Sequence, residues 1–394
     1  LVVGTLVTQD RSLFFEYDNS FLTNPLWLSP FKLPPEKGLQ EHKDLGFGPI
    51  FGVFDDSLPD GWGLLLMDRY FRQKGIDLQD INVLHRLAYL GNRTMGALTY
   101  HPPDELAHAE YSKLDLHHLN NESQDIIQGK CKKVLPLLLK AGGSPGGARP
   151  KVLVGLKGRD MISGEYNLPK DYEHWMIKFY SNASLVEEGL VEYAYSLMAR
   201  AADIQMATTK LFSTDEGENF FGVKRFDRKD GKRLHIHTLG DLIHSNFRIP
   251  SCDYEDLLKA TRILTKNDRE VNRAFRLMVF NILTNNRDDH VKNFAFLMRP
   301  TGEWELAPAY DLTYSLGPGG EHSLTVLGEG KNPSKEHCLA LAQKFSISTK
   351  TAREHIKSVI ETIENWDSIA RKIGISSKMR ETVKRNIDDN LARF

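Results

Sequence analysis

The sequence predicts an α+β protein whose N-terminal part contains most of the strands and whose C-terminal part is largely helical. Short runs of β-branched and aromatic residues, bounded by turn-forming residues, predict strands up to about residue 227. From about residue 235 the pattern becomes helical, apart from short strands near 294–298 and 304–307. A cluster of four glycines at 142–147 precedes the central strands, so the order is glycine loop, strands, helix, strands.

Composition and charge are those of an ordinary globular protein, with 41% hydrophobic and 26% charged residues among 394. The net charge of −1 argues against a whole-surface affinity for nucleic acid or membrane, but it allows a local patch. Cys131, Cys252 and Cys338 are far apart, so we expect reduced thiols rather than a disulfide framework or a zinc site. No apolar run approaches the ~20 residues of a membrane span, and we expect a cytoplasmic protein with no membrane partner. The chain starts with Leu1, so we expect that a few residues precede it.

The first unit extends to about residue 110. Residues 1–17 alternate like two strands and predict a hairpin turned at "TQDR". A helix is expected after them, with Asp60 as its N-cap and Gly75 as its stop. "INVLHRLAYLGNR" predicts a second helix, and "MGALTYHP" predicts a closing strand.

The middle of the chain begins with a polar link near 104–122 and a helix broken at Pro136. Two strands are expected next, at 152–158 and 174–180. A long helix at 185–203 follows them, and two further strands are expected at 208–213 and 220–227. Near the C-terminus, one face of the helix in 351–366 predicts core positions at Ala352, Ile356, Val359, Ile360 and Ile363.

The glycine loop "GGSPGGARPK" is a candidate anion site. Its glycines allow a close approach of the backbone, so successive N–H groups can line a phosphate, and Lys151 can reach the same group. The loop is neither a P-loop nor G-x-G-x-x-G, and a flexible linker is the alternative interpretation.

Lys178, in the strand "HWMIKFY", is a candidate phosphate ligand. A protein kinase places such a lysine on its third strand, paired with a glutamate of the next helix. Among Glu187, Glu188 and Glu192 we favour Glu192, which lies on the apolar side of that helix. The alternative is a lysine that points to solvent on an alternating strand.

A cluster of polar residues follows the hydrophobic helix near residue 280. Asp288 and Asn293 have the D-x-x-x-x-N spacing of the catalytic Asp and metal-binding Asn in protein kinases. Asp311 follows after two short strands and supplies a second carboxylate for Mg²⁺. His290 makes the pattern D-x-H-x-x-N, closer to lipid-kinase loops, and is expected to anchor the loop by hydrogen bonds. Asp289 and Lys292 are interpreted as structural or phosphate-facing.

Taken together and in this order, these motifs resemble the HipA family of serine/threonine kinases, the toxins of HipBA-type toxin–antitoxin pairs. "DDSLPDGWG" and "LGNRTMGALTY" resemble the N-terminal subdomain of that family, and "GGSPGGARPK" resembles its phosphate loop. "WMIKF", "VKRFDR", "DDHVKN" and "YDL" resemble its lysine strand, its interlobe segment and its catalytic and metal-binding motifs.

The resemblance implies a two-lobed protein-kinase-like fold with an added N-terminal α/β subdomain (1–110), an N-lobe (111–228) and a helical C-lobe (229–394). It implies ATP and Mg²⁺ as cofactors, Asp288 as the catalytic residue, Asn293 and Asp311 as metal ligands, and Ser144 as an autophosphorylated serine. The nucleotide contacts that it implies are Gly146, Gly147, Ala148, Arg149, Pro150, Lys151, Lys178, Lys224, Arg225, Phe226, His290, Val291, Lys292, Asn293, Tyr310 and Asp311. The implied partners are a HipB-like DNA-binding antitoxin, operator DNA through that complex, and a component of translation such as an aminoacyl-tRNA synthetase.

Two other functions are compatible with the sequence. A kinase of the same fold can be non-toxic, or act on a small molecule or a lipid. Alternatively, the chain acts mainly as a corepressor in a DNA complex, since residues 331–394 hold 13 Lys and Arg against 8 Asp and Glu. A solvated helical face explains such a modest excess equally well.

Overall fold

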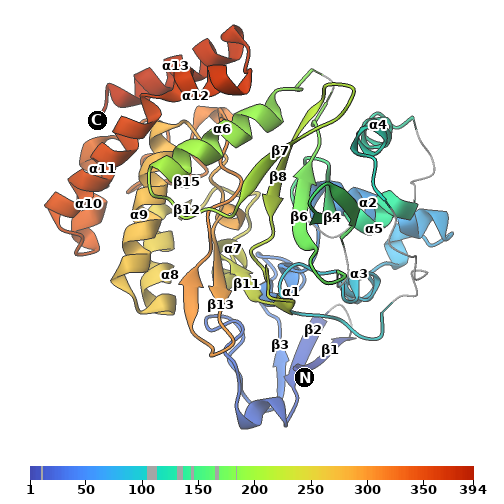
Figure 1. Cartoon of the computed structure of the whole chain (residues 1–394). Helices are drawn as coiled ribbons and strands as arrows, with labels where there is room; N and C mark the ends of the chain where they lie inside the picture. The colour runs from blue at the N-terminus through green and yellow to red at the C-terminus, as the bar shows by residue number, and fades with distance from the viewer. Residues whose placement is uncertain (10–11, 104–112, 131–135, 143–145, 165–167, 183) are drawn as a thin grey trace. The chain divides into compact units, whose positions relative to one another are not determined.

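The structure is a computed structural model that describes all of the chain except residues 10–11, 104–112, 131–135, 143–145, 165–167 and 183 (Figure 1). The chain divides into two compact units. Unit 1 comprises residues 1–189 and 209–237, and unit 2 comprises residues 190–208 and 238–394. None of the helices in the described ranges is long and apolar enough to cross a membrane.

Unit 1 contains most of the strands. Its elements are β1 (Gly4–Gln9), β2 (Ser12–Tyr17), η1 (Phe21–Thr23), β3 (Leu39–Glu41), α1 (Gly52–Asp55), α2 (Gly61–Gln73), η2 (Leu78–Asp80), α3 (Val83–Leu90), α4 (Leu116–Ile127), α5 (Pro136–Gly142), β4 (Lys151–Lys157), β5 (Asp160–Ser163), β6 (Glu173–Lys178), β7 (Thr209–Ser213), β8 (Asn219–Lys224), β9 (Arg228–Lys229), β10 (Lys232–Arg233) and β11 (His235–Thr238). The last residue of β11 already belongs to unit 2.

The N-terminal hairpin is confirmed. β1 and β2 are antiparallel, and β3 adds a third strand beside β2. Phe15 and Tyr17 of β2 are buried, and their rings pack edge to face with centroids 4.7 Å apart. Alternate aromatic residues on one face of β2 therefore fix which side of this small sheet is buried.

A five-stranded antiparallel sheet forms the centre of unit 1, in the order β5-β4-β6-β8-β7. β4, β6, β7 and β8 confirm the predicted strands, and β5 was not predicted. The sheet is covered by helices, because α5 packs against β4 and α2 packs against α5. Trp62 and Leu66 of α2, Leu138 of α5, and Val152 and Ile177 of the sheet share one hydrophobic core.

The predicted strand at "MGALTYHP" is wrong. Among the described residues the segment has no strand partner, and arginine side chains bind the backbone oxygen of Gly96 within it and that of Thr94 just before it. Arg233 donates from Nε to the oxygen of Gly96 at 2.9 Å and from Nη2 to that of Thr94 at 2.8 Å, and Arg228 donates to both oxygens as well. Gly96 also has a φ of 71°, which a regular strand does not allow.

The polar link and broken helix expected at 104–141 also need correction. α4 begins at Leu116, inside the segment interpreted as a link, because Leu119, Ser123 and Ile126 form a buried face. Asp115 caps this helix by accepting from the N–H of His118 at 3.0 Å. Pro136 is the first residue of α5, where a missing N–H costs nothing.

Unit 2 is mostly helical, as expected. Its elements, with α6 starting at the end of unit 1, are α6 (Glu188–Ala201), α7 (Leu239–Ile243), β12 (Cys252–Asp253), α8 (Tyr254–Thr265), α9 (Asp268–Leu283), η3 (Val291–Asn293), β13 (Ala295–Met298), β14 (Trp304–Leu306), η4 (Pro318–Gly320), β15 (Leu324–Thr325), α10 (Lys335–Lys344), α11 (Thr349–Ile363), α12 (Trp366–Ile373) and α13 (Ser377–Leu391). β13 and β14 confirm the two predicted strands, whereas the short strands β11, β12 and β15 were not predicted.

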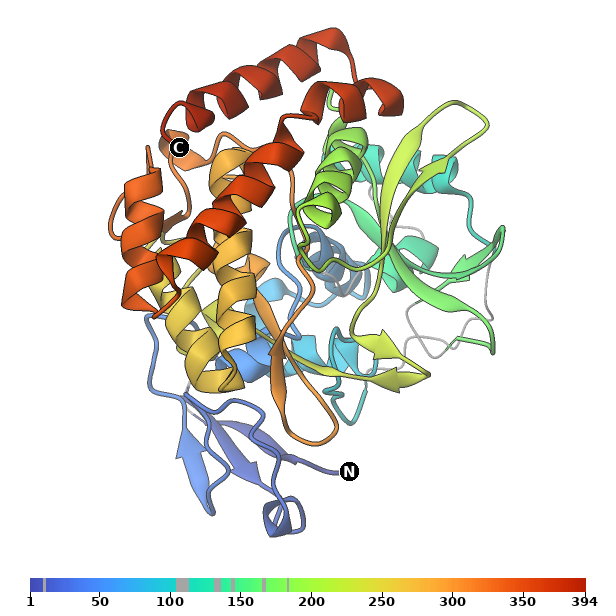
Figure 2. The same ribbon diagram turned by 60° about the vertical axis from the view of Figure 1, so that its left-hand side comes forward.

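The helix α9 forms the core of unit 2 and leads directly into the polar cluster. Figures 1 and 2 show α8 and α9 (yellow to gold) side by side, and α11 and α13 also contact α9. Phe275, Met278 and Phe280 are completely buried, as expected for a helix that is apolar on more than one face. On α11 the predicted core face is largely correct, but Ile360 is only half-buried and His355 and Thr362 are buried in addition.

Candidate active site

The glycine loop is held against the N-terminus of α2. Ser144, the predicted modification site, lies with its two neighbours outside the described residues. The N–H of Gly147, whose φ is 93°, donates to the Asp60 carboxylate, and the Gly147 oxygen accepts from the N–H of Trp62 at 3.1 Å. A Cβ on Gly61 would lie 2.6 Å from the Cα of Ala148, so the two backbones are in close contact. Asp60 therefore does not act as the side-chain cap that the sequence predicts; its carboxylate binds the loop instead.

Two lysines lie behind this loop on adjacent strands. Lys151 of β4 and Lys178 of β6 are directly opposite in the antiparallel register, so their side chains leave the same face of the sheet. Both are buried, with 3% and 7% of their surface exposed. The Lys151 ammonium donates to the oxygen of Gly146, and the Lys178 Nζ lies 5.8 Å from the centre of the Phe221 ring. The solvent-facing alternative for Lys178 is therefore wrong.

Arg149 connects the loop to the start of α6. Its Nε donates to the Phe179 oxygen at 2.5 Å and lies 3.6 Å from the Glu188 carboxylate. The same carboxylate accepts from the N–H of Ser181 at 2.8 Å. Glu188 is thus bound to the glycine loop, whereas Glu192, our choice as partner of Lys178, is buried on α6 in unit 2. The pairing of Lys178 with Glu192 stays a prediction.

The segment Lys224–Phe226 contains both an exposed and a buried cation. The Lys224 Nζ makes a 2.6 Å ion pair with the Glu173 carboxylate. The Arg225 guanidinium instead makes a buried, bidentate ion pair with Asp227, at 2.9 and 2.6 Å. Asp227 also accepts from the N–H of Gly96 at 2.8 Å. Burial alone would raise the pKa of Asp227, but the guanidinium groups of Arg225 and Arg228 hold that pKa well below its usual range.

In unit 2, the polar cluster forms a short loop stabilised by its own side chains. The Nδ2 of Asn293 donates to the backbone oxygen of Asp288 at 2.6 Å. His290 accepts at Nδ1 from the N–H of Lys292 at 3.2 Å, as expected of an anchoring residue. The Asp288 carboxylate is 56% exposed, with its Oδ1 4.0 Å from Nε2 of His290. The loop therefore presents this carboxylate to solvent without burying it.

The adjacent Asp289 points the other way. It is 1% exposed and accepts three hydrogen bonds, from the Tyr254 hydroxyl at 2.6 Å, His322 Nδ1 at 2.8 Å and the N–H of Ser323 at 2.8 Å. Burial, and the neighbouring Asp289 carboxylate, raise the pKa of Tyr254 well above its ordinary value, so its hydroxyl remains a donor. Of the two roles considered for Asp289, the structure supports the structural one.

The remaining predicted residues of unit 2 surround the loop. The Lys292 ammonium lies 3.4 Å from the buried carboxylate of Asp241, and its backbone oxygen accepts from the Tyr310 hydroxyl at 2.6 Å. Asp311 follows Tyr310 in the left-handed region, with a φ of 53°, which aspartate tolerates better than most residues. Val291 is buried and starts the short helix η3.

Oxygen donors in this loop fit Mg²⁺. The side-chain nitrogen of Asn293 donates to the Asp288 carbonyl, so the side-chain oxygen of Asn293 is the atom that can coordinate a metal ion. The Asp311 carboxylate adds a charged oxygen donor, and both are the hard ligands that Mg²⁺ prefers. The two groups therefore suit a magnesium ion, whereas a soft metal would require sulfur ligands.

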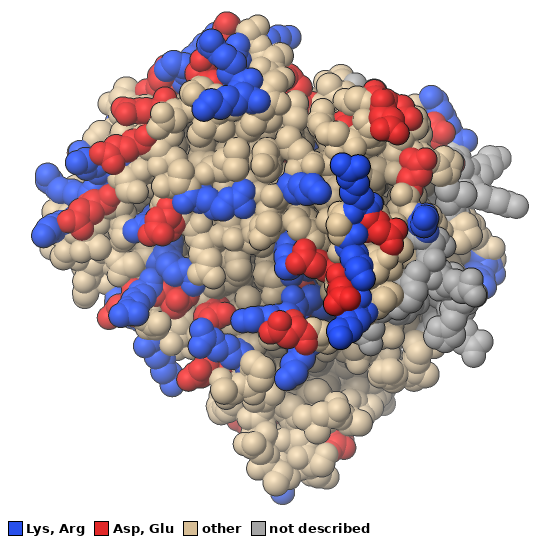
Figure 3. Space-filling view, viewed as in Figure 1, with Lys and Arg blue, Asp and Glu red and all other residues tan. Residues whose placement is uncertain are grey.

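The basic excess near the C-terminus is mixed with acidic residues. On the face shown in Figure 3, positive and negative side chains lie interspersed among the described residues. Within α11 to α13, ion pairs neutralise much of the charge, including Arg371–Asp367 at 2.7 Å and Lys384–Asp388 at 2.8 Å. This pattern favours a solvated helical face over a phosphate-binding patch.

Comparison with known proteins gives two family matches. The model of the HipA N-terminal domain matches residues 1–101, and that of the HipA-like C-terminal domain matches residues 143–366. Among curated proteins, the putative kinase Y4dM of Sinorhizobium fredii (strain NBRC 101917 / NGR234) is 23% identical over 229 residues, which are 53% of this chain and 55% of that protein. The match thus spans about half the length of this curated relative.

Among solved structures, HipA of Shewanella oneidensis MR-1, determined with HipB and its operator DNA, is similar with a TM-score of 0.73 and 16% identity. The likeness covers 100% of this chain and 94% of that chain. A weaker likeness, with a TM-score of 0.40 and 14% identity, is to the proinflammatory kinase CtkA of Helicobacter pylori, over 56% of this chain and 88% of that one. The Shewanella likeness is one of fold, and it confirms the α+β fold that the sequence predicts.

Two aspartates near the glycine loop and the interlobe segment were missed from the sequence. Asp60 was interpreted only as a helix cap, and its partner Gly147 is 87 residues away. Asp227 was not singled out, although it lies between two arginines in "RFDR", a pattern that indicates an ion-pair cluster.

Proposed function

The chain belongs to the HipA family, and from that premise we propose that it is an ATP- and Mg²⁺-dependent kinase that phosphorylates serine or threonine hydroxyl groups of proteins. The observation that carries this proposal is the pair of buried lysines, Lys151 and Lys178, behind the glycine loop.

Two ammonium groups placed opposite one another on a sheet repel each other, and their burial makes the repulsion stronger. Directly opposite residues have Cβ atoms about 4.5–5.5 Å apart, so one polyanion can contact both side chains. A triphosphate is large enough and negative enough to contact both cations, and the glycine residues 146–147 allow its oxygens to approach the backbone. These features support a nucleotide site formed by the loop, Lys151 and Lys178, with Arg149 and Lys224 to Phe226 as further proposed contacts.

The catalytic loop supplies the acid–base chemistry in this proposal. The hydroxyl oxygen of the acceptor attacks the γ-phosphorus of ATP, the bond from that phosphorus to the β,γ-bridging oxygen breaks, and ADP leaves. Asp288 takes the hydroxyl proton, for which its exposed carboxylate is accessible. Asn293 and Asp311 would hold Mg²⁺, which neutralises charge on the phosphate oxygens. His290 and Lys292 position the loop through the bonds described above.

We also propose Ser144 as a site of autophosphorylation. It belongs to the loop proposed to cover the ATP phosphates, and a phosphate there would add about −1.5 to −2 charges beside the triphosphate. Like charges at such short range disfavour ATP binding, so the modification would switch the kinase off. Peptide mass mapping after incubation with Mg-ATP tests this; an active enzyme without phosphate on Ser144 contradicts it.

The biological role proposed is that of a toxin. Family membership supports it, and so does the fold likeness to a HipA that was solved with HipB and operator DNA. We therefore propose a HipB-like DNA-binding antitoxin as partner, operator DNA through that complex, and a component of translation, such as an aminoacyl-tRNA synthetase, as substrate. Phosphoproteomics after induction of the chain, with Asp288→Asn as control, identifies the substrate.

The central experiment measures phosphate transfer from labelled ATP to lysate proteins by the purified chain, together with ATP binding. Lys178→Met should weaken ATP binding at least tenfold, because a charge-assisted hydrogen bond contributes about 1.5–3 kcal/mol. The matched control is Lys210→Met, an exposed lysine of β7 in the same sheet. Equal effects of the two substitutions on ATP binding, or transfer only to small molecules or lipids, would reject the proposal.

A further inference from the structure

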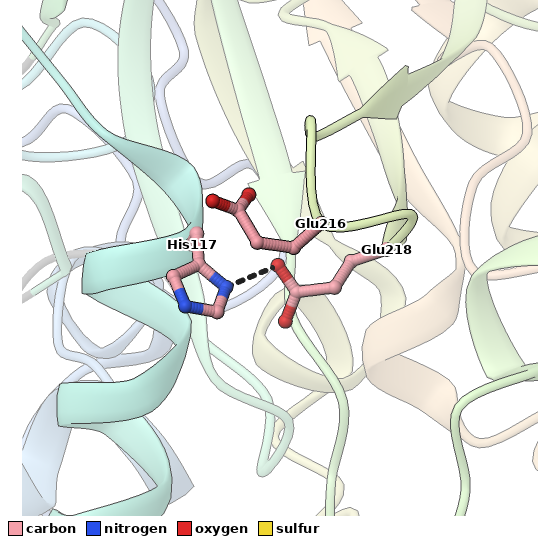
Figure 4. A group of neighbouring side chains, drawn as sticks. All are labelled: His117, Glu216 and Glu218. Carbon is pink, nitrogen blue, oxygen red and sulfur yellow. Dashed lines mark hydrogen bonds and ion pairs between the residues drawn. The ribbon is translucent and has the colours of Figure 1, made fainter.

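A cluster of one histidine and two glutamates contains none of the residues assigned to the nucleotide. His117 comes from α4, whereas Glu216 and Glu218 come from the turn between β7 and β8, about one hundred residues later in the chain (Figure 4). One ligand atom of each side chain lies within 4.8 Å of the other two. The three side chains converge from two elements of unit 1.

We propose that His117, Glu216 and Glu218 bind a zinc-class divalent metal ion that links α4 to the β7–β8 turn. The donor set is one imidazole nitrogen and two carboxylate oxygens, and zinc sites with an open fourth position likewise use three ligands of the histidine, carboxylate and cysteine types. Imidazole favours zinc, copper, iron and nickel over magnesium, which prefers oxygen ligands and keeps several waters. This proposal is independent of the kinase function.

The geometry requires only small movements. With zinc–nitrogen and zinc–oxygen distances of about 2.0–2.2 Å, tetrahedral ligands lie about 3.4 Å apart. His117 Nδ1 and Glu218 Oε2 are 2.9 Å apart, so this pair must open by about half an ångström to admit the ion. Glu216 is exposed, and no hydrogen bond of its carboxylate is found in the described part of the chain. Its side chain can therefore turn toward the ion without loss of a contact.

Neighbouring side chains already orient the two inner ligands. The Glu218 carboxylate accepts from Asn120 Nδ2 at 3.1 Å and from the Thr214 hydroxyl at 3.1 Å. His117 Nε2 lies 2.9 Å from Nδ2 of Asn121. When Nδ1 binds a metal, Nε2 carries the proton, and a rotation of the Asn121 amide presents its oxygen as the acceptor. Hydrogen bonds of this kind, which orient the side chains that hold the ion, are typical of metal-binding histidines and carboxylates.

A buried oxygen beside the cluster gives independent support. Asn120 is 3% exposed, and its Oδ1 has no hydrogen-bond partner among the described residues, although its Nδ2 binds Glu218. A buried acceptor without a donor is unfavourable by about 1–3 kcal/mol. A water molecule in the open position of the metal would be polarised by the ion and would be the donor that this oxygen needs.

The test is titration of the full-length, chelator-treated chain with Zn²⁺, followed by calorimetry, and with Co²⁺, followed by its visible absorption. We expect one Zn²⁺ per chain and a Co²⁺ spectrum typical of four ligands. His117→Gln and Glu216→Gln should each weaken Zn²⁺ binding at least tenfold. Millimolar Mg²⁺ should not displace the ion.

Glu216→Gln should not disturb folding, because the Glu216 carboxylate is exposed, whereas His117→Gln also removes the contact between His117 and Glu218. His118→Gln, the next residue on α4 and an exposed histidine, is the matched control and should bind Zn²⁺ like the wild type. Zn²⁺ affinity that is unchanged in both His117→Gln and Glu216→Gln, or lowered equally by His118→Gln, would overturn the proposal. So would the absence of stoichiometric Zn²⁺ binding by the wild-type chain.

Discussion

Asn293 donates a 2.6 Å hydrogen bond from its side-chain nitrogen to the backbone carbonyl oxygen of Asp288. This bond joins the two ends of the D-x-x-x-x-N motif and so closes the loop. The backbone N–H of Asn293 adds a second bond, of 2.8 Å, to the backbone oxygen of His290. The amide that is proposed to bind Mg²⁺ therefore also fixes the backbone that carries the proposed catalytic carboxylate. The bond uses the main chain of Asp288, and the Asp288 carboxylate itself is 56% exposed.

Asp288→Asn should abolish most phosphoryl transfer while the fold persists. An amide cannot take the hydroxyl proton, and the loss of a general base costs about 10²–10⁴-fold in rate. ATP affinity and melting temperature should change little, because the carboxylate is exposed. Transfer from labelled ATP and calorimetric ATP binding check the two halves. Wild-type turnover in this variant would contradict the assigned role.

Asp289→Asn should have the opposite effect, a loss of stability. The Asp289 carboxylate accepts three buried hydrogen bonds, and an amide would place its NH2 group against at least one of these donors, the N–H of Ser323 or the pair Tyr254 and His322. Breaking such a buried polar network costs about 3–5 kcal/mol. Chemical denaturation measures the free energy of unfolding, with Asp288→Asn as the matched neighbour. Equal unfolding free energies for the two variants would show that the buried bonds of Asp289 contribute little.

Asp311→Asn should weaken the Mg²⁺-dependent part of ATP binding. Asparagine tolerates the left-handed backbone at this position, where φ is 53°, so the substitution changes the ligand charge and leaves the backbone unstrained. Removal of one charged oxygen ligand should raise the Mg²⁺ concentration that supports half-maximal ATP binding by about tenfold. ATP binding in chelator should equal that of the wild type. A variant with an unchanged Mg²⁺ requirement would exclude Asp311 as a ligand.

The loop 288–293 could be predicted from the sequence because its contacts are local. Asp288, His290, Lys292 and Asn293 bind one another within six residues, so a short motif contains the whole arrangement. The central strands were also predictable, since their apolar residues form the core on both faces of β4. In both cases the information lies within one segment.

Contacts between distant segments could not be predicted in this way. The segment "MGALTYHP" has the composition of a strand, but Arg228 and Arg233 bind the carbonyl oxygen of its Gly96 from more than 130 residues away. Similarly, Asp60 is a suitable helix cap by position, yet its carboxylate binds Gly147. A polar side chain has several possible partners, and only the fold decides which one it reaches.

The stability of unit 2 should depend on the protonation of His355. This imidazole accepts at Nδ1 from Nε of Arg276 at 3.0 Å, and Arg276 is itself paired with Asp203. Burial, followed by the charge of Arg276, lowers the pKa of His355 to about 4. As the pH falls below about 6.5, the unfolded chain binds a proton that the folded chain refuses until about pH 4. The unfolding free energy should therefore fall across this window, by at most about 3 kcal/mol from this group.

His355→Gln isolates this contribution. Burial also lowers the pKa of His174 and His235 to about 4, but both remain in the variant. The difference in unfolding free energy between wild type and variant should shrink as the pH falls from 6.5 to 4. Denaturation at several pH values measures it, and a difference that is constant with pH would refute the assignment.

Asp60→Ala should strengthen ATP binding under the proposed function. The Asp60 carboxylate accepts from the N–H of Gly147, which is one of the donors that a phosphate would need. It also places a negative charge beside the loop proposed to cover a triphosphate. Asp60 makes no side-chain cap bond to α2, so its removal takes no hydrogen bond from that helix. Releasing one charge-assisted donor should therefore raise ATP affinity about three- to tenfold.

The matched control for this variant is Asp80→Ala, which removes the same charge from an exposed position of η2 in the same unit. If Asp60 competes with the nucleotide, only Asp60→Ala should bind ATP more tightly in a calorimetric titration. The gain should shrink little with added salt, because the bond between Asp60 and Gly147 is partly buried. If Asp60 instead holds the loop in its binding conformation, Asp60→Ala should bind ATP more weakly than Asp80→Ala. That second result would reverse the sign of this prediction and make Asp60 a positioning residue for the loop.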